Sequence, residues 1–286
     1  MRSGRGFILD VDDVLLEMER SVSAAEGALR RALEEPLGAA EARAIEARIQ
    51  AQYAILKGEL RRTEGAPLPE AGALRKRIVG WQRGVALSGH EVKLWSREVM
   101  LAIALEDRGH KPERGLIRTA VDAYWDEVAE RSALHPDAKR LIDALIAGGE
   151  AFHLATNSDG FLELDEAGRT FFYDPEDARA RKMGRLRPIW AAGVKREAVT
   201  IGDPVGKPHP AFYERVIQDF GRHLGALPDK QRLLAVGDSW SNDVAPFLSM
   251  GVGQGVLILR GQPRPTTLGK GGRIIEALTE LLASEN

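Results

Sequence analysis

Three aspartates stand together directly after an apolar segment near the amino terminus. The apolar run 7–9 leads into Asp10, and Asp12 and Asp13 follow after a single valine. Carboxylates this close repel one another and lose hydration at the end of a buried strand, which disfavours their charged forms. A metal ion, another cation or a raised pKa would relieve that cost. The segment therefore predicts a site that holds a cation or a proton.

Three further polar groups follow apolar segments later in the chain. They are Thr156 with Asn157, Lys207 after a glycine-rich stretch, and Asp238 with Asp243. In an open parallel sheet, ligands bind beyond the carboxyl ends of the strands. Acids, a hydroxyl group and a lysine can hold a hard divalent cation with an anion beside it, because Mg²⁺ prefers oxygen ligands and bridges carboxylate to phosphate. We therefore predict a hard divalent cation among the aspartates, with an anion next to it.

The elements that would position these groups alternate between strand and helix from residue 135 onward. Short apolar strands are predicted at 151–155, 198–201, 233–236 and 254–259, and helices at 137–148, 210–222, 243–250 and 273–283. This alternation favours a parallel sheet with helices on both faces.

Residues 18–134 show a different pattern, in which helix follows helix. Apolar residues recur every three or four positions from 39 to 62, turn residues follow at 63–69, and further helices are predicted at 70–84, 91–107 and 113–131. We predict an α/β, doubly wound, Rossmann-like core of residues 1–17 and 135–286, with an inserted all-helical cap domain at 18–134. The segment 160–187 is long for a connection and is predicted to carry a strand near 170–173.

Composition excludes several classes of function. The 286 residues carry a formal net charge of -2, which predicts no nucleic-acid or membrane partner. The basic residues at 179–187 follow an acidic stretch and are predicted to form a solvated face. No cysteine is present, which excludes disulfides and thiolate metal sites. No uncharged apolar run is long enough to span a bilayer, and we predict a cytoplasmic protein.

Each polar group has a simpler explanation when it is taken alone. Loop aspartates commonly form turns or cap helices, a lone Lys207 is typical of a solvated loop, and Asp243 suits the first turn of a helix. Two other motifs do not fit. An EF-hand would need glycine at Leu15 and glutamate at Ser21. A Walker A motif would need its glycines one residue further apart and Ser or Thr at Pro208.

Taken in order, the four groups resemble the four motifs of the haloacid dehalogenase-like hydrolases. The matching residues are Asp10-Val11-Asp12 after a strand, Thr156 at a strand end, Lys207 in Gly-Lys-Pro-His-Pro, and Gly237-Asp238 with Asp243. The resemblance covers residues 6 to about 258, and the inserted helical block is similar to the helical cap of that family. One motif alone is weak, but the ordered set is specific.

The resemblance implies a role for each residue. Asp10 would be the nucleophile that forms an aspartyl-phosphate, and Asp12 the general acid and base. The phosphoryl oxygens would be bound by Thr156, Asn157 and Lys207. Mg²⁺ would be held by the Asp10 carboxylate, the Asp12 backbone carbonyl, Asp238 and Asp243.

The resulting hypothesis is a Mg²⁺-dependent phosphatase that acts on a small phosphorylated metabolite. Asp12 counts against the dehalogenases of the family, which lack that acid, and against its phosphonate-cleaving branch. Two alternatives remain open at this point. A phosphomutase would use the same core with different cap residues, and a non-catalytic member would keep the fold as a binding or assembly module.

Overall fold

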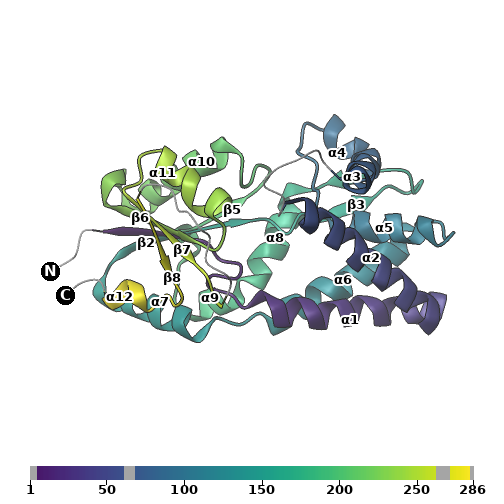
Figure 1. The fold of residues 1–286 in the computed structure, drawn as a ribbon, viewed down its shortest axis with the longest axis horizontal. Helices are drawn as coiled ribbons and strands as arrows, with labels where there is room; N and C mark the ends of the chain where they lie inside the picture. Colours follow the sequence, from purple (N-terminus) through teal and green to yellow (C-terminus); the bar gives the residue numbers. More distant parts are fainter. Residues whose placement is uncertain (1–4, 61–67, 262–270, 284–286) are drawn as a thin grey trace. The chain divides into compact units, whose positions relative to one another are not determined.

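The computed structural model describes residues 5–60, 68–261 and 271–283 (Figure 1). Contacts between residues group the chain into two compact units. The core unit comprises Met1–Glu19, Ser132–Ser158 and Met183–Asn286, and the helical unit comprises Arg20–Arg131 and Asp159–Lys182. The chain therefore leaves the core unit twice, once shortly after the first strand and again after Ser158.

The core unit is built on a parallel sheet. Within the described ranges the sheet has six strands in the order β5-β2-β1-β6-β7-β8, and each neighbouring pair is parallel. The strands are β1 (Gly6–Leu9), β2 (Ala151–Asn157), β5 (Val199–Gly202), β6 (Leu233–Gly237), β7 (Gln254–Ile258) and β8 (Gly272–Ile275). The order runs outward from β1 in both directions, as in a doubly wound sheet. The predicted α/β fold is confirmed.

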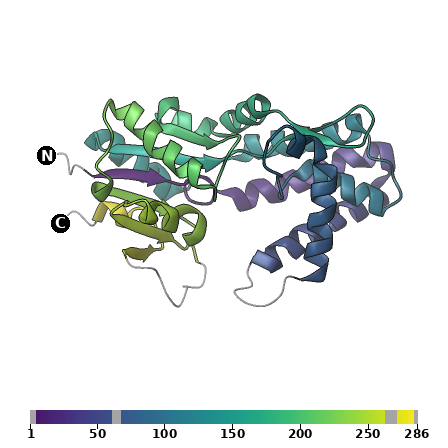
Figure 2. The ribbon, with the colours of Figure 1, turned by 90° about the horizontal axis from the view of Figure 1, so that it is seen from above.

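Helices cover both faces of this sheet (Figures 1 and 2). Successive strand residues point to opposite faces, so Leu9 and Val236 pack with Leu141 on one face while Ile8 packs with Phe212 on the other. The first face is covered by α7 (Pro136–Gly148), α9 (Arg187–Ala191) and α12 (Glu280–Ala283), and the second by α10 (Pro210–Leu224) and α11 (Ala245–Ser249). Burial on both faces explains why the strands are almost continuously apolar.

The register places the carboxyl ends of four strands side by side. Leu9, the last residue of β1, pairs with Leu154 and with Val236. Asn157, at the end of β2, pairs with Gly202, at the end of β5. The residues that follow these strands therefore meet at one edge of the sheet.

The helical unit contains the helices between β1 and α7. They are α1 (Met18–Leu37), α2 (Ala39–Leu60), α3 (Pro69–Trp81), α4 (Arg83–Leu87), α5 (Arg97–Asp107) and α6 (Arg114–Arg131). The helix predicted at 91–107 begins later, because Ser96 caps α5 by accepting a hydrogen bond from Val99 N. Residues 61–67, with most of the predicted turn, lie outside the described residues. In the described part of the chain, no helix combines the length and apolar character that crossing a bilayer requires.

The segment Asp159–Lys182 differs from the predicted division. The sequence predicts it as part of the core, whereas its contacts group it with the helical unit. It begins with an antiparallel hairpin of β3 (Leu162–Leu164) and β4 (Phe171–Tyr173), so the strand predicted near 170–173 is confirmed. The Thr170 hydroxyl ties the hairpin to the helices by accepting a hydrogen bond from Gly84 N at 2.9 Å. Among the described residues of the insertion, this hairpin is the strand structure and the other regular elements are helices.

Helix α8 (Pro175–Arg185) leads from the hairpin back into the core unit. Asp174 caps its first turn by accepting two backbone hydrogen bonds. The basic run 179–187 lies along and just beyond it, and the predicted solvated face is wrong for two residues. Lys182 is 0% exposed and Arg185 is 3% exposed, so each needs an acidic partner to offset its buried charge.

The helix predicted at 273–283 is also wrong. Gly272–Ile275 forms β8 instead, paired in parallel with β7, and only Glu280–Ala283 is helical. Ile274 and Ile275 are β-branched residues that suit a strand. Their apolar run is short, and periodicity alone does not distinguish a strand from a helix in so short a run.

Candidate active site

Backbone contacts shape the loop that carries the first two acids. Asp10 continues the ladder of β1, because its N–H donates to Val236 O at 2.9 Å. The chain then turns: Leu15 N donates to Val11 O at 2.9 Å. Asp13 adopts a left-handed φ of 59°, which aspartate tolerates better than most residues. This tight turn keeps the acids at the edge of the sheet.

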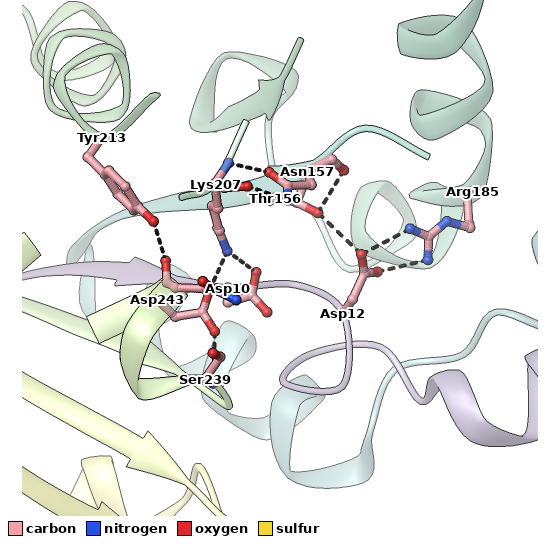
Figure 3. Close-up of polar contacts among 10 residues, drawn as sticks. Asp10, Asp12, Thr156, Asn157, Arg185, Lys207, Tyr213, Ser239 and Asp243 are labelled. Carbon is pink, nitrogen blue, oxygen red and sulfur yellow. Dashed lines mark hydrogen bonds and ion pairs between the residues drawn. The ribbon is translucent and has the colours of Figure 1, made fainter. Parts of the chain in front are cut away.

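A cleft of about 290 Å³ opens at this edge. It is lined by Asp10, Asp12, Asp13, Asn157, Lys207, Asp238, Ser239, Asn242 and Asp243. Thr156 is fully buried beside it, with its Oγ1 atom 3.4 Å from Oδ2 of Asp12. The fold thus brings together, from four strand ends, all seven residues to which the resemblance gives a role. Figure 3 labels all of them except Asp238.

Lys207 lies between two of the acids. Its Nζ atom contacts Oδ1 of Asp10 and lies 2.7 Å from Oδ1 of Asp243, and all three side chains are buried. Burial alone lowers the pKa of Lys207, but the charges of Asp10 and Asp243 together raise it above its ordinary value. For Asp10, burial dominates and raises the pKa well above its usual range, although Lys207 opposes this. One cation therefore does not fully compensate these acids.

The aspartate cluster fits a divalent cation. Asp10, Asp238 and Asp243 each offer a carboxylate oxygen, and these oxygens all lie within 4.8 Å of one another. Partial desolvation in the cleft, and then the charge of Asp243, raise the pKa of Asp238 to about 7. Oxygen donors that repel one another this strongly are the ligands that Mg²⁺ prefers. A bound cation would remove the repulsion.

A glycine allows Asp243 to approach the end of β6. A Cβ atom at Gly237 would lie 2.0 Å from Cβ of Asp243, so no other residue fits there without moving the acid. The turn is closed by Ser239, whose N–H donates to Oδ2 of Asp243 at 2.9 Å. Tyr213 supports it from α10 by donating to Asn242 O at 2.7 Å. The glycine of the fourth motif thus has a steric cause.

Asn157 connects the end of β2 with the loop that carries the lysine. Its Oδ1 atom accepts a hydrogen bond from Lys207 N at 2.7 Å, and its Nδ2 atom donates to Lys207 O at 3.4 Å. On the other side, Arg215 of α10 donates to the backbone carbonyls of Ile201, Asp203 and Val205 at 2.7–3.1 Å. His209 caps α10, where its ring accepts from Ala211 N. These contacts hold Lys207 at the cleft.

Three arginines support the site without any signal in the local sequence. Arg185 pairs with both carboxylate oxygens of Asp12, at 2.8 and 3.1 Å. Arg260 donates to the backbone carbonyls of Asp13 and Val14, at 3.3 and 2.8 Å. Arg215 is the third. Each acts on residues that are distant in sequence or bound through backbone atoms, so no residue spacing marks them.

A model of the haloacid dehalogenase-like hydrolases matches residues 5–251. The chain belongs to this hydrolase family. The predicted resemblance is confirmed over nearly the whole chain. No curated protein matches the sequence.

Solved structures of this family share the fold of the hydrolase at low sequence identity. A putative hydrolase from Bacillus subtilis, bound to magnesium, has a TM-score of 0.55 and 16% identity, with 100% of each chain covered. A phosphatase from Thermococcus onnurineus has a TM-score of 0.53 and 16% sequence identity, and the match covers 98% of this chain and 97% of the phosphatase. A 2-haloacid dehalogenase from Pseudomonas syringae has a TM-score of 0.53 and 18% sequence identity, and the match covers 99% of this chain and 97% of the dehalogenase. The fold therefore suits both chemistries, and the site has to distinguish them.

Replacing Lys207 should destabilise the metal-free hydrolase. Lys207→Met leaves Asp10 and Asp243 buried without their counter-charge, which costs about 3–5 kcal/mol of unfolding free energy when a buried pair is broken. The loss should be smaller at pH 5 than at pH 8, because protonation neutralises Asp10, whose pKa is raised by burial. Denaturant unfolding in EDTA measures it. Adding Asp243→Asn should recover part of the loss, and equal stability of Lys207→Met and wild type would contradict this charge balance.

Proposed function

We propose that this hydrolase is a Mg²⁺-dependent phosphatase, which cleaves a small phosphorylated metabolite through an aspartyl-phosphate on Asp10. One observation carries the proposal. The carboxylate of Asp12 stands in the same cleft as the buried Asp10 and next to the Thr156 hydroxyl. Asp12 is not one of the three acids whose oxygens group for a cation, so its carboxyl group is available for the proton transfer that cleavage of a phosphate ester needs.

The two chemistries of the family differ in this need. When a phosphate ester is cleaved, the leaving oxygen of an alcohol departs as a strong base and requires a proton. A halide departs as a stable anion and requires none. Asp12 therefore favours a phosphate ester over a carbon–halogen bond as the substrate.

The residues of the cleft support a two-step displacement. A carboxylate oxygen of Asp10 attacks phosphorus while the bond to the leaving oxygen breaks, and Asp12 gives that oxygen a proton. Asp12 then takes a proton from water, whose oxygen attacks the same phosphorus and releases phosphate and the Asp10 carboxylate. Lys207 and the Thr156 hydroxyl bind the phosphoryl oxygens and offset their charge. When bound, Mg²⁺ would be held by Asp10, Asp238, Asp243 and the Asp12 carbonyl, and would supply positive charge beside the phosphoryl group.

We further propose that the helical unit is a cap domain that selects the substrate. The site residues of the core unit are acids, a hydroxyl, an amide and a lysine, all suited to a phosphoryl group and a cation. The remainder of a metabolite has to be recognised elsewhere, and the helical unit is the large element inserted directly after the loop of Asp10 and Asp12.

Asp12→Asn should distinguish substrates by their leaving groups. General acid catalysis is worth about 10²–10⁴-fold in rate, so kcat/KM should fall by this range for an alkyl phosphate. It should fall far less for para-nitrophenyl phosphate, because para-nitrophenolate departs without a proton. Equal losses on both esters would show that Asp12 does not transfer the proton.

A substrate panel tests the function itself. Purified protein with Mg²⁺ should release phosphate from at least one phosphorylated metabolite and from para-nitrophenyl phosphate. It should release no chloride from 2-chloropropionate. Chloride release without phosphate release would assign the protein to the dehalogenases, and neither release would favour a non-catalytic member. Transfer of phosphate between two positions of one sugar would favour a phosphomutase.

A further inference from the structure

Arg185 is the last residue of α8 and lies within the core unit. Its side chain is 3% exposed, whereas that of Asp12 is 33% exposed at the cleft. Nη1 donates to Oδ1 of Asp12 at 2.8 Å and Nη2 donates to Oδ2 at 3.1 Å, so the planar guanidinium matches the carboxylate at two points (Figure 3). Nη1 also lies 3.0 Å from Sδ of Met18. The buried arginine is thus fixed, and it fixes a partly exposed acid.

The two oxygens of Asp12 differ in their surroundings. Oδ1 has the shorter contact with Arg185. Oδ2 has the longer one, and it is the atom that the Thr156 hydroxyl approaches at 3.4 Å. Thr156 is a predicted ligand of the phosphoryl group, so Oδ2 is the oxygen of Asp12 that lies on the side of the predicted phosphoryl site. A carboxyl group can keep one oxygen on an arginine while the other carries the proton.

We propose that Arg185 is a positioning residue for proton transfer, which holds Asp12 so that Oδ2 exchanges the proton with the leaving group and with the attacking water. The proposal rests on the proposed phosphatase function and deepens it. Oδ1 stays bound to Arg185 throughout, and Oδ2 loses its proton to the leaving oxygen in the first step and regains one from water in the second. Proton transfer requires heavy atoms about 2.6–3.2 Å apart, and an aspartate free to rotate about two torsions meets this requirement only part of the time.

A positioning role and a merely structural role predict different losses. If Arg185 only stabilised the fold, its removal would reduce turnover of all substrates together. If it positions Asp12, the loss depends on how much the leaving group needs a proton. It also disappears when Asp12 cannot transfer one.

The test is a double-mutant cycle on two substrates. Arg185→Gln and Asp12→Asn, singly and together, are assayed with Mg²⁺ on glycerol 2-phosphate and on para-nitrophenyl phosphate. We expect Arg185→Gln to lower kcat/KM, which covers the steps up to departure of the leaving group, by about 10–100-fold on the alkyl ester, as the loss of an outer orienting partner typically does. The loss on the aryl ester should be at most a few-fold. In the Asp12→Asn background, Arg185→Gln should cost nothing further.

Two more variants keep the result interpretable. Arg185→Lys keeps the charge but not the two-point geometry, so it should recover only part of the lost rate. Lys182→Gln is the matched control, because Lys182 is the other buried cation of α8 and pairs with Asp159 at 3.3 Å. It removes a similar buried charge and should leave the ratio of the two substrates unchanged. Thermal unfolding of every variant shows whether it is folded.

Three results would overturn the proposal: equal losses on both esters, a further loss of about tenfold or more in the Asp12→Asn background, or a changed substrate ratio in Lys182→Gln as large as in Arg185→Gln. A wild-type protein that hydrolyses neither ester would instead contradict the proposed function. The two failures are therefore distinguishable.

Discussion

Asp10→Asn should give a folded protein without turnover. An amide oxygen is a poor nucleophile, so no aspartyl-phosphate forms. Removing the nucleophile of an active site that works as a unit lowers kcat by a factor on the order of 10⁴ or more. Phosphate release from para-nitrophenyl phosphate with Mg²⁺ measures the loss, since this ester needs no general acid and isolates the attack of Asp10.

The same substitution should not destabilise the protein. Burial raises the pKa of Asp10 well above its usual range, so its charged form is disfavoured in the folded state at neutral pH. A neutral side chain of the same shape removes that cost, and Lys207 keeps its contact with Asp243. The melting temperature without metal should therefore be equal to or above that of the wild type.

A surface aspartate provides the control. Asp143 lies on α7, where it forms an exposed pair with Lys139, and Asp143→Asn should change neither turnover nor stability measurably. Activity of Asp10→Asn near that of the wild type would show that another group attacks phosphorus. Loss of folding would leave the nucleophile to be identified by trapping a phosphorylated residue in the wild type.

Sequence patterns predict the site well because its residues follow strands. The apolar runs that end at Asp10, Thr156 and Asp238 form neighbouring parallel strands, and strand ends in such a sheet share one edge. Local sequence therefore determines where these side chains point. The order of the four groups along the chain matches the family motifs, and this order makes the prediction specific where one motif alone is weak.

Side chains that act across the fold were not predictable in this way. Arg185 reaches Asp12 over 173 residues and Arg260 reaches Asp13 over 247. Arg185 belongs to a basic run whose local pattern suggests solvent, because charge alone does not show which residue a neighbouring element will cover. The strand Gly272–Ile275 was mistaken for a helix for a related reason, since it is defined by its pairing with β7.

The metal-free protein should lose stability as the pH rises from about 4 to about 7. The pKa of Asp238 is raised to about 7, and that of Asp10 is raised as well, from ordinary values of 3.8. Between these limits the folded state binds more protons than the unfolded chain, so the unfolding free energy falls with pH. Other groups contribute to the profile: Glu98, with a pKa of about 7 caused by burial, adds to the fall, and His153, with a pKa of about 4 caused by burial, opposes it.

Mg²⁺ should reverse this loss and be required for activity. EDTA should abolish phosphate release, and Mg²⁺ should restore it, because three acids with Lys207 as their only counter-charge among the described site residues repel the phosphoryl group as well as one another. Binding also stabilises the folded state, by about 2.7 kcal/mol at a metal concentration one hundred times the Kd. The ion binds deprotonated carboxylates, so its effect on the melting temperature should be larger at pH 8 than at pH 5.

The difference between the melting temperatures with and without Mg²⁺ reports on the aspartate cluster, because titratable groups away from the metal contribute equally to both measurements. Asp238→Asn should remove most of the Mg²⁺-induced shift and raise the Mg²⁺ concentration needed for activity. Glu98→Gln is the matched control, because it removes an acid of similar pKa in the helical unit. It should alter the pH profile but leave the Mg²⁺-induced shift intact. A shift that is equal at pH 5 and pH 8, or that survives in Asp238→Asn, would place the ion elsewhere, and the crowded acids at the end of β1 would then be balanced by Lys207 and by protons alone.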